Sequence, residues 1–525
     1  MYRMKLLILF SFLLSSSFNV DAQNDQVNWG ELTGNQGRLI KLLPNQNNEF
    51  YALRWVGGRL LGGYQVTHHK NLALINKKKI KIVAENSIAN FEGAQVFGGK
   101  FVTFLSDKNV NGNHLFLQEY SDDLQETKDP VKLATYSFDQ SKKKGGFRTA
   151  MSSNKKFLAV IWLISGKRNE RDIYGFNIFN TDLELINEGE YPLPFAPQMS
   201  TIHSHHISNK GDYFMAITEF EEKSKTSLFK SHLNYKALHI FRINEDGLDD
   251  FKIDLNGKRI DAMSMTSDEN NVFILTGIYG VMNSPGVEGI FHQRVDLNTG
   301  KKLNEGFKEF EESFITQDWS EQAKKKAERK KSRGRGEPQL YDYKMRDITI
   351  LKDGTIVGTM EQFYVQVRTY SDPRSGTTSQ SYQYYYNDII AFKINQTGKF
   401  DWIKKIRKFQ VSTNDEGPYS SYHSYIDEGK VKLIFNDHIK NYENGKFIDS
   451  EKIAVTSYSR KKNVASLVSI DLNSGDVDRS IFFERAKVNT LIIPKLFKVD
   501  YSNNEVLLYS ISGRREKIGT LKIKD

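Results

Sequence analysis

The sequence predicts an all-β protein, namely a β-propeller of eight blades, with seven blades as the alternative. Three observations predict this fold. Apolar residues recur with a period of two, polar turn clusters interrupt them at short intervals, and one strand–turn phrase recurs along the chain. A period of two is that of a strand with one buried face, so segments such as VKLIFND (431–437) are expected to be strands.

The recurring phrase is an apolar strand followed by Asn and, two or three residues later, Gly. Asn favours a turn that its own side chain hydrogen-bonds, and Gly permits a positive φ, so each phrase predicts a tight hairpin between neighbouring strands. The copies are FRINEDG (241–247), RVDLNTG (294–300), AFKINQTG (391–398) and VSIDLNSG (468–475).

Before each phrase the chain shows a strand, a polar turn and a strongly apolar strand. Together these form the four-stranded meander of a propeller blade. A stack of β-sandwiches is the alternative, but it would require more Pro-rich linkers than the sequence contains. The predicted units are 38–86, 90–136, 146–191, 199–258, 259–312, 342–410, 420–485 and an incomplete unit at 491–523.

The last unit has three predicted strands and lacks a fourth. The segment QVNWGELT (26–33) is a candidate for it, because it is similar to KFDWIKKI (399–406), the fourth strand of an earlier unit. We expect this N-terminal strand to close the ring, which would leave no exposed sheet edge.

The first residues predict export. Arg3 and Lys5 precede an apolar run over residues 6–14, and a small residue ends the segment. This is the pattern of a secretory signal peptide over residues 1–22, and its apolar run is too short to span a membrane. We expect the domain to comprise residues 23–525, without a transmembrane segment, and to be periplasmic or secreted.

Residues 314–340 interrupt the β pattern. Residues 318–331 are strong helix formers that begin at Asp318, a residue type that caps helices, and the stretch ends in Ser-Arg-Gly-Arg-Gly. We expect an inserted, solvent-exposed basic helix with a flexible tail after the fifth blade.

The positive charge of the chain is concentrated in this insertion. Residues 320–336 hold eight basic and two acidic residues, whereas the whole chain has a net charge of +10. Two interpretations stay open, namely a solvated helix without a partner and a contact with an anionic polymer. Nucleic acid is not expected as a partner, because the chain is exported and no aromatic residues interleave with the charges.

Three histidines in TIHSHHISNK (201–210) suggest a site. With a period of two, His203 and His205 share a face and His206 points the other way, so the three cannot converge on one metal ion. His423 occupies the position equivalent to His205, since each lies six residues before a turn glycine. We expect these side chains to be satisfied within the blade packing, or alternatively to face the central channel and bind a ligand there.

Tyrosines and carboxylates supply further candidates. Tyr384 and Tyr386 alternate on one segment and could stack against sugar rings, or could simply extend a hairpin. Glu361 and Asp437 directly follow apolar strands, where loops project, and a pair of carboxylates can hydrolyse a glycosidic bond. Asp437 is also a candidate binding residue.

Several chemistries are excluded or disfavoured. The chain has no cysteine, which excludes disulfides, thiolate metal sites and cysteine nucleophiles. It also lacks a Gly-x-Ser-x-Gly elbow, a phosphate-binding loop, a His-Glu-x-x-His motif and a dinucleotide-binding fingerprint. We expect no metal and no cofactor.

Three segments resemble a known group of proteins. GTIVGTMEQF (354–363), YYYNDIIAFKINQTGKFDWIKKIRKFQ (384–410) and VKLIFNDHIKNY (431–442) are similar to uncharacterised secreted β-propeller-like proteins of Bacteroidota. The resemblance covers residues 340–445 well and the remainder in layout. It implies a propeller fold and an exported protein, and it provides no catalytic residues.

These observations favour a non-enzymatic propeller of the bacterial envelope that binds a ligand or acts as a scaffold. The ligand would be a glycan, another envelope polymer or a protein. The alternative is a propeller enzyme, a lyase or hydrolase acting on polysaccharide. Geometry separates the two hypotheses, because an enzyme needs several of these side chains to converge in one pocket. The enzyme's candidate residues are His203, His205, His423, Glu361 and Asp437.

Overall fold

The structure is a computed structural model. It describes residues 27–58, 61–84, 87–109, 112–137, 146–164, 166, 170–196, 199–220, 235–244, 247–253, 257–281, 286–334, 336–371, 374 and 377–524. The predicted signal peptide, residues 1–22, lies outside the described residues.

The described strands form antiparallel sheets, most of four strands, that succeed one another along the chain. The first two sheets comprise β3 (Arg38–Pro44), β4 (Glu49–Val56), β5 (Gly63–Lys70) and β6 (Ala73–Lys79), then β9 (Asn90–Phe97), β10 (Lys100–Asn109), β11 (Gly112–Glu119) and β12 (Val131–Tyr136). The third and fourth comprise β13 (Phe147–Met151), β14 (Leu158–Ile164), β15 (Ile173–Phe179) and β16 (Leu185–Pro192), then β17 (Ser200–Ile207), β18 (Tyr213–Phe220), β19 (Tyr235–Asn244) and β20 (Gly247–Ile253).

The later sheets carry additional strands. The fifth and sixth comprise β21 (Lys258–Ser267), β22 (Val272–Val281), β23 (Gly289–Asp296) and β24 (Lys301–Glu309), then β25 (Tyr343–Ile350), β26 (Ile356–Ser371), β27 (Thr378–Ile394), β28 (Phe400–Ile406) and β29 (Gln410–Thr413). The next comprises β30 (Tyr422–Asp427), β31 (Lys430–His438), β32 (Tyr442–Glu443), β33 (Lys446–Phe447), β34 (Asn463–Asp471) and β35 (Val477–Glu484).

The last sheet combines both ends of the described chain. It contains β36 (Leu491–Ile492), β37 (Lys498–Asp500), β38 (Glu505–Ser512), β39 (Arg515–Lys522), β1 (Val27–Trp29) and β2 (Thr33–Gly34). The remaining short elements are β7 (Val83–Ala84), β8 (Ser87–Ile88), η3 (Ile439–Asn441), α3 (Arg485–Val488) and η4 (Pro494–Leu496).

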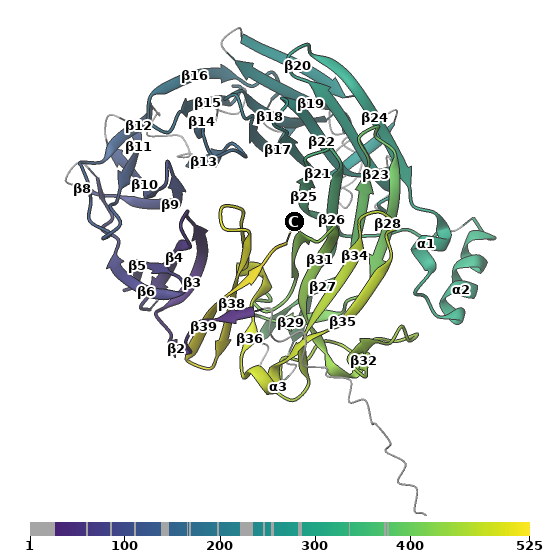
Figure 1. The fold of residues 1–525 in the computed structure, drawn as a ribbon. Coiled ribbons are helices and arrows are strands. Elements are labelled where there is room, and N and C mark those ends of the chain that lie inside the picture. Colours follow the sequence, from purple (N-terminus) through teal and green to yellow (C-terminus); the bar gives the residue numbers. More distant parts are fainter. Residues whose placement is uncertain are drawn as a thin grey trace, which may run out of the picture.

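The sheets are arranged around a ring, in the manner of a propeller (Figure 1). The first strand of a sheet lies near the centre of the ring, and the last strand lies at the periphery, as β17 and β20 show. The protein is therefore all-β and propeller-like.

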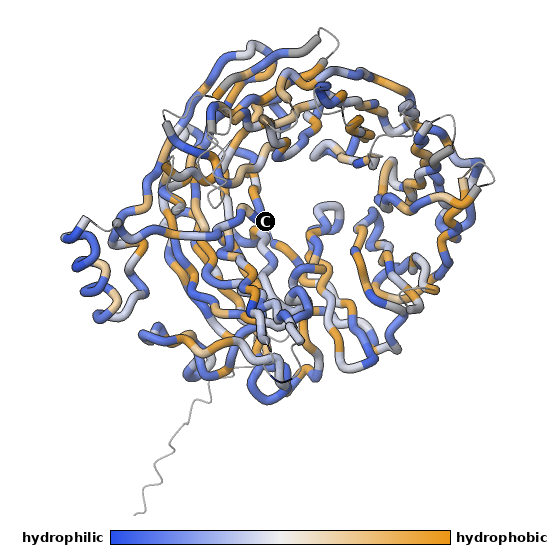
Figure 2. The backbone as a smooth tube through the Cα atoms, turned by 180° about the vertical axis from the view of Figure 1, so that it is seen from behind, coloured by the Kyte–Doolittle hydropathy of each residue, from blue (hydrophilic) through white to orange (hydrophobic). Residues whose placement is uncertain are grey.

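The core consists of layers between neighbouring sheets. One layer joins Phe214 and Leu238 of the fourth sheet to Phe273 and Phe291 of the fifth, and all four side chains are buried. Burial of a side chain of this kind contributes about 1.5–3 kcal/mol, so each pair of sheets is held mainly by its apolar layer. Figure 2 shows the corresponding alternation of hydrophobic and hydrophilic residues along the strands.

Three of the recurring Asn–Gly phrases form turns as predicted, and residues 245 and 246 of the fourth, FRINEDG, lie outside the described residues. Gly300, Gly398 and Gly475 have φ values of +67°, +87° and +72°, which glycine adopts without steric cost. In one phrase the side-chain Oδ1 of Asn395 accepts hydrogen bonds from the backbone N–H groups of Thr397 and Lys399, both at 3.0 Å.

The first strands of five sheets contain a β-bulge that the sequence did not reveal. The register shifts at the third or fourth residue of each of β3, β9, β17, β21 and β25, and a single residue is left without a partner opposite it. A bulge bends its strand and changes the direction of the extra side chain. The bulged residues are Ile40, Glu92, His203, Asp261 and Arg346.

The N-terminal strand pairs with the last strand of the chain, as its sequence predicts. Val27 lies opposite Leu521, and Trp29 lies opposite Gly519, in an antiparallel register. A Cβ atom at Gly519 would lie 2.6 Å from the ring of Trp29, so glycine leaves the room that the indole occupies. Trp29 also packs edge-on against Phe483 of the preceding sheet, with ring centroids 6.1 Å apart.

The insertion forms two helices, α1 (Glu312–Thr316) and α2 (Glu321–Lys331), which lie outside the ring next to β28 (Figure 1). The helix begins later than the predicted start at Asp318, because the side chain of Ser320 accepts the capping hydrogen bond from the N–H of Ala323. Asp318 instead pairs with Lys405 at 3.2 Å. None of the residues of α2 is buried, and the helix is largely hydrophilic (Figure 2).

A membrane-spanning helix requires about 20 apolar residues. Within the described part of the chain, every helix is too short or too polar to cross a membrane.

Candidate functional site

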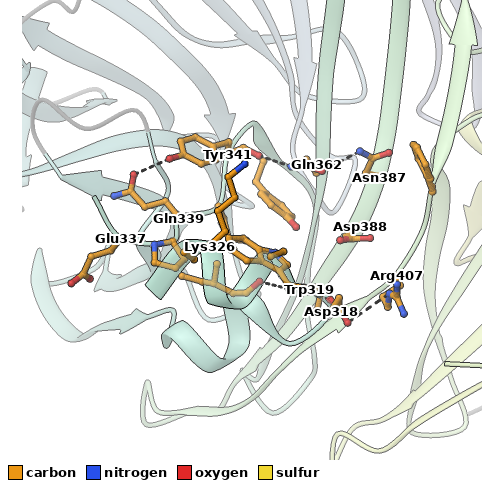
Figure 3. Close-up of a pocket in the computed structure, with 18 of the residues that line it drawn as sticks. Asp318, Trp319, Lys326, Glu337, Gln339, Tyr341, Gln362, Asn387, Asp388 and Arg407 are labelled. Carbon is orange, nitrogen blue, oxygen red and sulfur yellow. Dashed lines mark hydrogen bonds and ion pairs between the residues drawn. The ribbon is translucent and has the colours of Figure 1, made fainter. Parts of the chain in front are cut away.

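The insertion and the sixth sheet enclose a cavity of about 1040 Å³ (Figure 3). Helix α2 forms one wall, and residues 336–341 form a second. The wall on the other side comes from the inner part of the hairpin between β26 and β27, from Lys405 near the end of β28, and from residues 407–409, which follow that strand. The cavity therefore exists because the helical insertion lies against the sheet.

Aromatic side chains provide the apolar part of this cavity. Trp319, Tyr341 and Tyr343 all line it. Tyr343 is buried, whereas Trp319 is half-buried and Tyr341 is 42% exposed. Two partly exposed rings at one cavity offer flat apolar faces to a ligand, and the tyrosine adds a hydroxyl group that can bind a polar substituent.

Amide side chains provide the polar part. The Nε2 of Gln362 donates to the backbone carbonyl of Tyr341 at 3.2 Å, and the Nδ2 of Asn387 donates to the Oε1 of Gln362 at 3.2 Å. The Tyr341 hydroxyl donates to Gln339 at 3.3 Å. The Oδ1 of Asn387 is buried and has no hydrogen-bond partner among the described residues, so it is available to a ligand.

Three carboxylates also line the cavity, namely Asp318, Asp388 and Glu337, of which Glu337 pairs with Lys331 at 3.3 Å. Asp388 accepts a hydrogen bond from the backbone N–H of Lys408 at 3.0 Å. Burial raises the pKa of Asp388, although this hydrogen bond and the ammonium of Lys405 act in the opposite direction. Asp318 lies 3.2 Å from the Lys405 ammonium and 3.7 Å from the Arg407 guanidinium. Asp388 therefore has a raised pKa, whereas Asp318 is held as part of an ion-pair cluster.

Helix α2 presents two cations to the cavity. Ala323, Lys326, Ala327 and Lys330 all line it, which follows from their spacing of three and four residues along one helix face. Figure 3 shows the side chain of Lys326 pointing into the cavity. Within the described part of the chain, no carboxylate pairs with Lys326 or Lys330, whereas neighbouring lysines of the helix do have such partners.

The three predicted histidines of β17 do not act together. The bulge at His203 breaks the expected alternation, so the prediction that His203 and His205 share a face is wrong. The Nε2 of His203 lies 2.6 Å from the hydroxyl of Thr218, on the side of β18 that faces the fifth sheet. His206 contacts Ser267 of that sheet at 2.8 Å, so it shares this side with His203.

His205 faces the preceding sheet instead. Its Nδ1 lies 2.8 Å from the Tyr213 hydroxyl and 3.0 Å from the Tyr174 hydroxyl. Burial, together with the nearby cation of Arg148, lowers the pKa of His205 to about 4, so the ring is neutral. His205 is satisfied within the packing, although it also borders a cavity of about 470 Å³ beside Arg148.

The predicted tyrosines are not equivalent. Tyr386 is buried, its hydroxyl donates to the carbonyl of Glu416 at 2.9 Å, and the ammonium of Lys495 lies 4.0 Å from its ring centroid. Phe363 covers the same residue with a ring-centroid distance of 4.7 Å. Tyr384 is half-buried and lies opposite Val365, so it alone of the predicted pair presents a ring to solvent.

The predicted carboxylates, Asp437 and Glu361, are both buried and both engaged in ion pairs with cations of the protein. Asp437 pairs with Arg479 and accepts hydrogen bonds from Asn441 and Tyr442, each at 2.8 Å. Glu361 belongs to a different cluster and shares none of these partners. Neither residue lines the large cavity. Among the described residues there is also no group of three His, Asp or Glu side chains suited to holding a metal ion.

His423 lines a smaller cavity of about 350 Å³.

The individual residues that line the large cavity could not be identified from the sequence, although the insertion itself could. One signal was present: Trp319 and Tyr341 flank the helical segment within 23 residues of each other, in a stretch that is otherwise almost entirely polar.

No protein-family model matches the chain, and no curated protein matches it. Solved structures with a similar layout include the polysaccharide lyase Uly1, which is 9% identical, with 94% of this chain and 92% of that chain covered and a TM-score of 0.35. An apocarotenoid oxygenase from Synechocystis is 9% identical, with 95% and 93% covered and a TM-score of 0.30.

Prolyl oligopeptidase B from Galerina marginata is 10% identical, with 79% of this chain covered and a TM-score of 0.30. This chain spans 56% of the length of that protein. The three proteins have three different chemistries, and similarity at this level supports no argument about function.

Proposed function

We propose that this protein binds a polysaccharide of the bacterial envelope without cleaving it, in the cavity between the helical insertion and the sixth sheet. The observation that carries the proposal is the composition of this cavity. Partly exposed aromatic rings (Trp319, Tyr341) line one space of about 1040 Å³. Beside them lie an amide oxygen (Asn387) and two cations (Lys326, Lys330) that have no partner among the described residues.

This composition matches the chemistry of an acidic sugar. A sugar ring has apolar C–H faces, which pack on aromatic rings, and a rim of hydroxyl groups, which bind planar amides and carboxylates. Cations without partners on α2 would favour a glycan that carries carboxylate or sulfate groups. The volume is at the upper end of the range of about 300–1,000 Å³ for ligand pockets, which fits several sugar units better than one.

The proposal includes the architecture and the location. The order of the sheets around the ring and the pairing of β1 with β39 support an eight-bladed propeller closed by its N-terminal strand. The pattern of residues 1–22 supports export to the periplasm or beyond. The segments that resemble secreted propeller-like proteins of Bacteroidota support membership of that group.

Affinity electrophoresis of residues 23–525 tests the proposal. The protein would migrate through gels that contain dextran, polygalacturonate or chondroitin sulfate. We expect retardation by the acidic polymers, and we expect Tyr341→Ala to weaken it at least tenfold. Tyr370→Ala is the matched control, since Tyr370 is 53% exposed on the outer part of the β26–β27 hairpin, away from the cavity lining. Equal melting temperatures of the two variants would exclude a folding defect.

Two results would contradict the proposal. One is the absence of retardation in every gel, and the other is an equal effect of the two tyrosine substitutions. A third result would favour enzymatic cleavage, for which the raised pKa of Asp388 next to Asp318 is the supporting observation. In that case the wild-type protein would release reducing ends from a polymer, and Asp388→Asn would abolish the release.

A further inference from the structure

A second cavity, of about 350 Å³, lies at the inner edge of the ring. Its walls come from three segments that are far apart in the sequence, namely β25, β30 and residues 494–501. Figure 1 shows β25 near the centre of the ring, and β25 and β30 are each the first strand of their sheet. We therefore place this cavity on the inner side of the ring. His423, which the sequence offers as a channel residue, lines it.

Positive charge exceeds negative charge around this cavity. Arg346, Lys495 and Lys498 line it, whereas Asp347 is the one carboxylate in its lining. Asp347 is already engaged, because it accepts a hydrogen bond from Ser424 at 2.6 Å. Arg346 is paired with Glu361, whereas Lys495 and Lys498 have no ion-pair partner among the described residues, and a bound anion would offset their charges.

A fourth cation adds to this excess. Lys41 belongs to β3, the first strand of the first sheet, and β3 packs against the segment that carries Lys498. Burial and the neighbouring Lys498 lower the pKa of Lys41, which places these two cations close together. Lys498 has no ion-pair partner in the described part of the chain, so its charge is available to a ligand.

The bulge in β25 explains why Arg346 reaches the cavity. Arg346 is the residue without a cross-strand partner, and its side chain is 33% exposed. Its Nε and Nη2 both donate to one oxygen of Glu361, at 3.0 and 2.7 Å. Its Nη1 makes no hydrogen bond to a described residue, so one edge of a guanidinium that is held in place stays free for an anion.

A histidine atom without a partner borders the same cavity. The Nε2 of His423 is buried and has no hydrogen-bond partner among the described residues. Burial, with a smaller effect of Lys498, lowers the pKa of His423 to about 3, so the ring is neutral and can donate one N–H. A buried polar atom that is left unsatisfied costs about 1–3 kcal/mol, and a ligand atom bound there removes that cost.

Aromatic residues complete the lining. Tyr501 is 74% exposed although it lies at the cavity, and Phe497 packs edge-on against His423 with a centroid distance of 5.7 Å. These rings can cover the apolar face of a small cyclic ligand. The volume of 350 Å³ is near the lower limit for ligand pockets, which favours one small molecule or the end of a chain.

We infer that this central cavity binds the carboxylate of a sugar acid, with the carboxylate between Arg346 and Lys498 and a hydroxyl group at His423. The sugar acid is either a free monosaccharide or the terminal unit of an acidic oligosaccharide. This site is separate from the large cavity at the insertion and does not depend on it.

Isothermal titration calorimetry tests the inference. The full-length mature protein would be titrated with glucuronate, with glucose as the neutral counterpart of the same shape, and with a tetramer of galacturonate. We expect glucuronate to bind at least tenfold more tightly than glucose. We also expect Lys498→Glu to weaken glucuronate binding at least tenfold. Lys498 has no ion-pair partner in the described chain, so this variant should fold normally, and Lys498→Gln serves as a milder second variant.

Lys301→Glu is the matched control, because Lys301 is an exposed lysine on the peripheral strand β24. Binding of glucuronate that is lost in Lys498→Glu and kept in Lys301→Glu supports a free sugar acid as the ligand. Binding of the tetramer alone, with the same response to the variants, supports the end of an oligosaccharide.

Other results would overturn the inference. They are the failure of the native protein to bind either acid, equal affinity for glucose and glucuronate, or equal losses in Lys498→Glu and Lys301→Glu. Failure of this inference can be told apart from failure of the proposed function, because Tyr341→Ala should weaken polysaccharide binding at the large cavity and leave glucuronate binding at the central cavity unchanged.

Discussion

Glu361 is the residue whose substitution we expect to destabilise the protein most clearly. It is fully buried in β26, and its carboxylate holds two cations. One oxygen accepts from Arg346 and from the hydroxyl of Ser421, at 2.7–3.0 Å and 2.8 Å. The other oxygen lies 2.8 Å from the ammonium of Lys408, which has no exposed surface of its own. Glu361→Gln keeps the shape of the side chain and removes its charge.

The expected loss follows from the position of Lys408. When one partner of a buried ion pair is removed, the uncompensated charge costs about 3–5 kcal/mol. Lys408 can limit this cost by releasing its proton. At pH 7 that release from an ordinary pKa of 10.5 costs about 5 kcal/mol, at about 1.4 kcal/mol per pH unit. We therefore expect Glu361→Gln to lower the free energy of unfolding by about 3–5 kcal/mol.

The pH dependence gives a second, independent signature. If Lys408 is neutral in the folded variant and protonated in the unfolded chain, the unfolded state binds one more proton. The stability of the variant then rises with pH, by up to about 1.4 kcal/mol per unit, until the pH reaches the pKa of the unfolded lysine. In the wild-type protein burial lowers the pKa of Lys408, and Glu361 acts against this lowering. Because the variant lacks that opposing charge, we expect its rise in stability with pH to begin at a lower pH than in the wild-type protein.

Urea unfolding of residues 23–525, followed by tryptophan fluorescence at pH 6 to 9, measures both effects. Glu305→Gln is the matched control: it breaks an ion pair of the same length, 2.8 Å, between side chains that are about half exposed. We expect that control to cost about 0–1 kcal/mol. A loss in Glu361→Gln as small as that of the control would refute the reasoning. The double substitution Glu361→Gln/Lys408→Met should recover part of the loss.

Two other predictions concern the ring and its centre. Trp29→Ala should lower the free energy of unfolding by about 1.5–3 kcal/mol in the same urea assay. The reason is that the indole packs on Phe483 and joins the N-terminal strand to its sheet. An unchanged unfolding curve would contradict a closing role for that strand. Burial lowers the pKa of Lys495 to about 8, although Glu361 acts against this and Arg346 acts with it. The affinity for glucuronate, measured by calorimetry, should therefore fall as the pH rises above 8, by up to tenfold per pH unit. An affinity that does not change up to pH 9.5 would contradict a charged role of Lys495.

The repeating architecture could be predicted from the sequence because its signals are local. Strand periodicity and the Asn–Gly turns extend over fewer than ten residues, and the structure has turns with positive φ at these glycines. The N-terminal strand that pairs within the last sheet could also be predicted, since QVNWGELT and KFDWIKKI have matching patterns. These inferences need no knowledge of how distant segments approach each other.

The details of the candidate sites could not be predicted in the same way. A β-bulge at His203 adds one residue and has no signature in composition, yet it reverses the side chain to the other face of the strand. The helix begins at Ser320 and not at Asp318, because Asp318 has cations from β28 and beyond as competing partners. Asp388 and Trp319 line one cavity although 69 residues separate them, and that proximity exists only in the fold.

The two cavities are connected through the charge cluster around Glu361. Lys408 lines the large cavity at the insertion, and Arg346 lines the central one. Both cations bind the same carboxylate, Arg346 at one oxygen and Lys408 at the other. The anion that we propose for the central cavity takes the free edge of Arg346, so the contact between Arg346 and Glu361 stays in place. The same buried residue that stabilises the sixth sheet therefore also fixes the position of one cation at each cavity.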